Sequence, residues 1–223
     1  MITEGLTQMK RHAFAMRTNL GCKGEFRKTL GTIWHTFTEF LDEHNMTNFS
    51  MWNVEDIVFG YYETSDQFEF TAQDKDFIEK WERQYGHLYT WISKPFEEMK
   101  LMYYDYGIVR ESKELIRHSV FITKLLPGAE DEYKSRHDAL IEKRQGKINP
   151  GPDSNFTIWS AEGYIFGYDE IDITMETEPT EEEKQATIQW ETKMLEIMSW
   201  FTNHVDWISG ECHPAIQKIA WHN

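Results

Sequence analysis

The chain has 223 residues, of which 38 are acidic and 23 basic, so its formal net charge is −15. Such a charge disfavours binding to nucleic-acid phosphates or to anionic membrane surfaces, whereas a neutral small molecule meets no such repulsion. A hydrophobic content of 40%, with 15% aromatic residues, is ample for the core of one large domain or two small ones.

Targeting segments and disulfides are not expected. The amino terminus lacks a basic stretch followed by an apolar core, and no segment approaches the roughly 18 apolar residues of a membrane span. Cys22 and Cys212 lie far apart in the sequence and do not form a disulfide framework. We therefore expect a cytoplasmic protein.

The first half of the chain alternates strand and helix patterns. Alternating residues predict a strand over 11–18, and apolar residues at 3.6-residue spacing predict a helix over 23–44. Two strands are expected over 47–53 and 56–63, because the second of these is rich in Ile, Val, Phe and Tyr. Regularly spaced aromatic residues then predict a second helix over 73–92, and a last strand follows at 99–109.

The second half repeats this order of elements. The expected elements are a strand over 116–124, a helix over 128–145, strands over 154–160 and 163–170, a helix over 181–203 and a strand over 215–222. An acidic run precedes the last helix, where Thr180 and Glu183 form a capping box. The capping box explains most of this acidity without a metal site.

The halves are copies of each other at an offset of about 107 residues, the size of a small domain. Four segments recur in the same order: 48–52 as 155–159, 57–61 as 164–168, 11–14 as 117–120, and Trp81-Glu82 as Trp190-Glu191. The repeat predicts two domains, one over 8–110 and one over 115–223, joined by the link 107–114.

The order β-α-β-β-α-β is that of the ferredoxin-like unit, which belongs to the α+β class. Its helices cover one face of the sheet, and the other face must also be buried. Two copies in one chain predict tandem α+β barrel domains that form a pseudo-dimer within one monomer. Further homo-oligomerisation stays open.

One helical pair in the second half has the chemistry of an acid–base catalyst. Tyr133 and His137 are spaced i,i+4, so both side chains project from one face of the helix. A phenol beside an imidazole can exchange protons with a bound hydroxyl group near neutral pH. The corresponding residues of the first half are Phe26 and Leu30, which cannot transfer protons. We therefore expect the active site in the second domain and a degenerate site in the first.

The Tyr-x-x-x-His helix motif, the strand motif Asn-aromatic-x-x-aromatic at 155–159 and Trp190 resemble the L-rhamnose mutarotase family of dimeric α+β barrels. The resemblance covers both halves. It implies a mutarotase that interconverts the anomers of L-rhamnose or a related neutral sugar, without cofactor or metal. It further implies that His137 donates a proton and that Tyr133 and Trp190 hold the sugar. The family commonly has Tyr where this chain has Phe156, so one sugar hydrogen bond is expected to be missing.

Other residues and functions remain candidates. Trp159 is suited to packing on a sugar ring, and Glu191 to accepting a hydrogen bond from a sugar hydroxyl. A non-catalytic module that binds a sugar or another small ligand would use the same pocket. A monooxygenase-like enzyme with haem or quinone chemistry is also compatible with the fold.

His35 and Glu39 share a helical face, but no third metal ligand accompanies them, which favours a surface pair.

Overall fold

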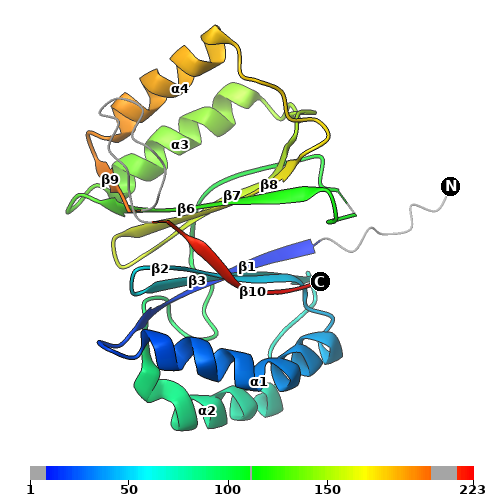
Figure 1. Ribbon diagram of the computed structural model, residues 1–223. Helices are drawn as coiled ribbons and strands as arrows, with labels where there is room; N and C mark the ends of the chain where they lie inside the picture. Colours follow the sequence, from blue (N-terminus) through cyan, green and yellow to red (C-terminus); the bar gives the residue numbers. More distant parts are fainter. Residues whose placement is uncertain (1–8, 111, 202–214) are drawn as a thin grey trace, which may run out of the picture. The chain divides into compact units, whose positions relative to one another are not determined.

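The computed structural model describes residues 9–110, 112–201 and 215–223. The chain divides into two compact units: unit 1 contains the residues up to Met99 together with Gln217–Asn223, and unit 2 runs from Lys100 to Ile216. Each unit has a five-stranded antiparallel sheet with two helices on one face (Figure 1). The predicted α+β class and the repeated ferredoxin-like order are confirmed.

Unit 1 has the sheet order β10-β2-β3-β1-β4. Its elements are β1 (Met9–Thr18), α1 (Lys23–Glu43), β2 (Thr47–Val54), β3 (Ile57–Ser65), α2 (Ala72–Tyr85), the 3-10 turn η1 (Gly86–Leu88), β4 (Tyr89–Trp91) and β10 (Gln217–His222). The helices bury their apolar faces on the sheet, and Phe26, Leu41, Phe49 and Val58 belong to the core between them.

Unit 2 has the corresponding order β5-β7-β8-β6-β9. Its elements are β5 (Lys100–Gly107), β6 (Ile116–Leu125), α3 (Glu130–Arg144), β7 (Asp153–Ala161), β8 (Tyr164–Asp172), α4 (Glu181–Met194) and β9 (Met198–Trp200). Its core contains Tyr133, Ile158, Ile165 and Met194.

The last strand of each sequence repeat belongs to the other unit. β5 ends the first repeat and pairs with β7, whereas β10 ends the second repeat and pairs with β2. The compact units therefore differ from the sequence ranges 8–110 and 115–223 by an exchange of strands. The free edges of β2 and β7 present equivalent backbone donors and acceptors, so either final strand can satisfy them.

The second helix of each repeat is shorter than the sequence pattern predicts. α2 ends at Tyr85, whereas the predicted helix extends to residue 92. α4 ends at Met194, whereas the predicted helix extends to residue 203; the last two residues of that range, 202–203, lie outside the described residues. The aromatic residues that continue the helical spacing, such as Trp91, lie instead on the short edge strands β4 and β9. Among the described residues, no helix is long and apolar enough to cross a membrane.

A glycine in each middle strand explains the repeated Phe-Gly-Tyr segment. Phe14 lies opposite Gly60, and Phe121 lies opposite Gly167. A Cβ on Gly60 would lie 2.0 Å from the Phe14 ring, and one on Gly167 would lie 2.1 Å from the Phe121 ring. Phe14 therefore corresponds to Phe121. The sequence alignment of 11–14 with 117–120 had instead paired Phe14 with Val120. That alignment was wrong by one residue, which reverses the face of a strand residue.

Candidate active site

Helix α3 carries the predicted Tyr and His on its inner face. Acidic residues in its first turn and Lys143 and Arg144 in its last turn complement the helix dipole. Tyr133 and His137 are the buried residues of this helix, with 2% and 4% of their surfaces exposed. Their rings stack with centroids 4.3 Å apart, so the i,i+4 spacing does bring phenol and imidazole together.

The hydrogen bonding of His137 fixes which ring nitrogen is free. Nδ1 lies 3.0 Å from the main-chain carbonyl oxygen of Tyr133. A carbonyl only accepts, so Nδ1–H is the donor and Nε2 carries the lone pair of the neutral ring. Burial lowers the pKa of His137 to about 4, since the imidazolium is poorly solvated there. The imidazole is therefore neutral at pH 7 and can first accept a proton, whereas the family resemblance implied that His137 donates one.

Two further side chains enclose the imidazole. The Tyr103 ring, from β5, lies 5.3 Å from it, and the Trp190 ring, from α4, meets it edge-on at 5.2 Å. Burial raises the pKa of Tyr133, and burial together with the nearby Asp105 carboxylate raises the pKa of Tyr103. Both phenols thus keep their protons near neutral pH, and the arrangement places a base among two hydroxyl donors and an aromatic wall.

Phe156 and Phe121 extend this aromatic cluster along the sheet. The Phe156 ring contacts Tyr103 in a T-shaped geometry at 5.5 Å and lies 6.3 Å from the Phe121 ring. Phe121 in turn lies over Gly167, which has no side chain in the way. Neither Phe can hydrogen-bond, so this side of the cluster is apolar.

The structure brings some predicted site residues together and separates others. Trp190 and Phe156 lie with Tyr133 and His137 in one cluster. Trp159 is buried on the opposite face of β7 from Phe156, because successive strand side chains alternate. Glu191 follows Trp190 on α4 and is half-buried.

The metal candidate of the first half is a surface pair, as the sequence favoured. His35 Nε2 lies 3.5 Å from Glu39 Oε1, and both side chains are exposed. No group of three or more potential metal ligands occurs in the described part of the chain.

Two residues of unit 2 were missed by the sequence reasoning. Tyr103 was assigned only to a strand, because its repeat gives no hint that the strand joins the other unit. Asp169 lies two residues after Gly167 on β8, hence on the same face as that glycine. Its Oδ1 is buried without a hydrogen-bond partner among the residues described, and burial, aided by Asp153, raises the pKa of Asp169 to about 8.

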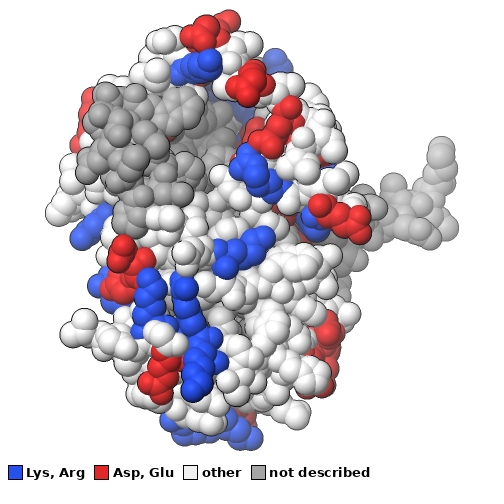
Figure 2. All heavy atoms as spheres, viewed as in Figure 1, with Lys and Arg blue, Asp and Glu red and all other residues white. Residues whose placement is uncertain are grey.

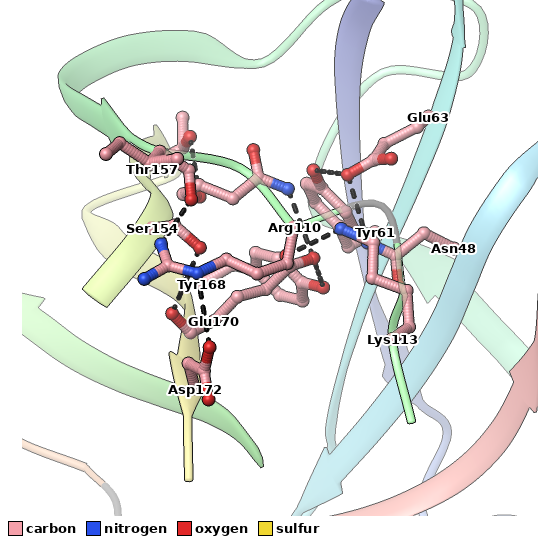
Figure 3. A network of polar contacts seen from close by, with 12 residues as sticks. Asn48, Tyr61, Glu63, Arg110, Lys113, Ser154, Thr157, Tyr168, Glu170 and Asp172 are labelled. Carbon is pink, nitrogen blue, oxygen red and sulfur yellow. Dashed lines mark hydrogen bonds and ion pairs between the residues drawn. The ribbon is translucent and has the colours of Figure 1, made fainter. Parts of the chain in front are cut away.

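The repeated Asn of the strand motif serves a buried polar network (Figure 3). In unit 2, Glu170 Oε1 accepts hydrogen bonds from the Asn155 amide at 3.2 Å and the Tyr168 hydroxyl at 2.9 Å. Lys113 Nζ lies 2.7 Å from the other carboxylate oxygen.

Unit 1 repeats this arrangement. The Asn48 amide and the Tyr61 hydroxyl donate to Glu63 Oε1 at 3.0 and 2.7 Å. Asn48 and Asn155 have left-handed φ angles of 51° and 58°, each at a register shift of its strand. Asn tolerates this backbone region better than most residues, so the repeated Asn has a structural role.

Comparison with protein families gives the same result for both halves. A family model described as L-rhamnose mutarotase matches residues 11–102 and, a second time, residues 118–215. No curated protein and no solved structure matches the chain. The double match confirms the tandem repeat.

Proposed function

Because the chain belongs to the L-rhamnose mutarotase family, we propose that unit 2 is a mutarotase that interconverts the anomers of L-rhamnose or a closely related neutral sugar. The observation that carries this proposal is the neutral imidazole of His137, enclosed by the rings of Tyr133, Tyr103 and Trp190. No other ring of the described helices combines a free basic nitrogen with two adjacent phenols in this way.

Mutarotation needs two proton transfers and no change of oxidation state. Nε2 of His137 takes the proton of the anomeric hydroxyl while a phenol gives its proton to the ring oxygen. The bond from C1 to the ring oxygen then breaks, which leaves an aldehyde and a chain hydroxyl. After rotation about C1–C2, the phenolate recovers its proton from that hydroxyl as the ring closes. The imidazolium returns its proton to the former aldehyde oxygen.

The walls of the cluster favour a sugar with an apolar edge. Trp190 and Phe156 contribute apolar aromatic surface that C–H groups can contact, and neither Phe156 nor Phe121 can satisfy a sugar hydroxyl. A methyl group therefore suits this wall better than a hydroxymethyl group, because a buried hydroxyl without a partner is costly. This chemistry fits a 6-deoxy sugar such as L-rhamnose.

Unit 1 lacks the phenol and the imidazole at the positions equivalent to Tyr133 and His137. Phe26 and Leu30 stand where unit 2 has Tyr133 and His137, and both pack against the core of unit 1. We therefore assign the reaction to unit 2 alone.

The proposal is tested by measuring anomer exchange with NMR on L-rhamnose and on L-mannose, which differs only by a hydroxyl on C6. The rate with L-rhamnose should exceed the spontaneous rate, and kcat/KM should fall by about ten-fold with L-mannose, as one unpaired buried hydroxyl predicts. Absence of acceleration with either sugar contradicts the proposal. Saturable binding of L-rhamnose without acceleration would identify a binding module instead.

A further inference from the structure

Unit 1 has an open groove where unit 2 has its candidate active site. The groove lies between α1 and β10 and has a volume of about 480 Å³. Its described lining comprises Arg27, Leu30, Gly31, Trp34 and residues 217–221, with no Asp or Glu among them. Several Lys and Arg side chains gather around α1 and β10 on this face (Figure 2).

Arg27 carries an uncompensated positive charge into this groove. One guanidinium nitrogen donates to the side-chain oxygens of Asn53 at 2.7 Å and Gln217 at 2.9 Å. Both partners are neutral amides, so they orient the guanidinium without cancelling its charge. Its Nε is buried without a hydrogen-bond partner, and no ion pair joins Arg27 to a carboxylate within the described ranges.

The equivalent cation of unit 2 is neutralised by its own helix. At the repeat offset, Arg27 corresponds to Lys134 and Gly31 to Asp138. Lys134 forms an i,i+4 ion pair with Asp138, whereas Gly31 offers Arg27 no such partner. A Cβ on Gly31 would meet no atom within 4 Å, so the glycine leaves open space beside the guanidinium.

A small residue on β10, Ala220, explains why the groove is open on the side of the strand. Ala220 pairs with Met51 as Tyr103 pairs with Ile158, so Ala220 is the counterpart of Tyr103. The small side chain leaves vacant the space that the Tyr103 ring fills in unit 2. Trp34 borders this space and packs 6.1 Å from the Phe49 ring, which holds its indole in place.

We propose that this groove is a second ligand site, which binds a small organic anion with its carboxylate or phosphate group on Arg27 and its ring along Trp34. A guanidinium with free N–H groups matches planar carboxylate and phosphate oxygens. The volume suits a molecule of monosaccharide size. The site takes a ligand class different from the neutral sugar of unit 2, and it stands whether or not unit 2 is a mutarotase.

The test is isothermal titration of the full chain with glucuronate, glucose 6-phosphate and inorganic phosphate. Gly31→Asp supplies the missing carboxylate one turn from Arg27, and Gly31→Asn is its uncharged match. We expect saturable binding of at least one sugar anion, weakened about ten-fold or more by Gly31→Asp. Gly31→Asn should change the affinity by no more than about two-fold. The stronger of the two sugar anions identifies the preferred charged group.

A second variant tests the groove itself. Ala220→Tyr inserts the ring that unit 2 has at this position and should abolish sugar-anion binding, while a thermal melt checks that the chain remains folded. Lack of saturable binding by both sugar anions, or equal affinity of wild type and Gly31→Asp, would overturn the proposal. Inorganic phosphate that binds as tightly as glucose 6-phosphate would overturn the contact with Trp34.

Discussion

The Tyr103 ring lies 5.3 Å from the imidazole of His137, although the two residues belong to different sequence repeats. Tyr103 reaches this position because β5 pairs with β7. The candidate site of unit 2 is therefore completed by a strand from the first half of the chain. Unit 1 contains β10 in the equivalent position, where Ala220 is the counterpart of Tyr103. The small side chain of Ala220 leaves a groove there.

Removal of the Tyr103 hydroxyl tests the role of the exchanged strand. Tyr103→Phe keeps the ring packing and deletes one proton donor, so we expect kcat for anomer exchange to fall by about 10²-fold. Tyr104→Phe is the matched control, because Tyr104 is an exposed neighbour on the same strand. Equal rates for the two variants would remove Tyr103 from the reaction.

The rate should depend on pH in a way that reports the burial of His137. Burial lowers its pKa to about 4, so the neutral base form is present throughout the range above that value. We expect a flat profile from about pH 5.5 to 8 and a decline only toward pH 4, after subtraction of the spontaneous rate. An inflection near 6.5 would indicate a solvated imidazole.

Lys113→Met should destabilise the protein strongly. Lys113 and Glu170 form an ion pair with side-chain exposures of 8% and 0%, and loss of the cation leaves a buried carboxylate unpaired. We expect a loss of about 3–5 kcal/mol in the free energy of unfolding, measured with urea. The double variant Lys113→Met/Glu170→Gln removes both charges and should recover much of that loss. A double variant as unstable as Lys113→Met would contradict this explanation.

Asp169→Asn should stabilise the protein at alkaline pH. The pKa of Asp169 is raised to about 8 in the folded protein, so the folded state favours the protonated form. Between the unfolded value of about 4 and pH 8, ionisation progressively favours unfolding. The variant should therefore gain about 1–3 kcal/mol relative to wild type at pH 8.5, and little at pH 4. A gain that does not vary with pH in thermal melts would contradict an ionisable origin.

The sequence predicts those elements whose patterns are local. The helix α1 follows from apolar spacing, α3 follows from the repeat of the element order, and the β-hairpins follow from the repeated strand motifs. The second helices were predicted too long because Trp81, Tyr85, Leu88 and Trp91 keep a helical spacing past Gly86, where α2 has already ended. Strand exchange depends on which of two similar edges a final strand joins, and no local pattern encodes that choice.

The candidate site likewise contains residues that local sequence patterns predict and residues that they do not. Tyr133, His137 and Trp190 were predicted, because a helical spacing and a repeated Trp-Glu segment mark them. Tyr103 became visible only with the strand pairing, and Asp169 only with its burial. Trp159 lies three residues after Phe156 on the same strand, so strand alternation alone places the two side chains on opposite faces.

Replacement of His137 tests the central claim most directly, with His44 as its matched control. His44 directly follows α1, and its Nδ1 contacts the main-chain carbonyl of Phe40 at 2.8 Å, as His137 contacts Tyr133 four residues back. The measurement is the anomer exchange rate of L-rhamnose by NMR for His137→Ala and His44→Ala. His137→Ala should lower the catalysed rate by about 10²–10⁴-fold, while His44→Ala keeps the wild-type rate. A folded His137→Ala variant that exchanges anomers at the wild-type rate would contradict the account.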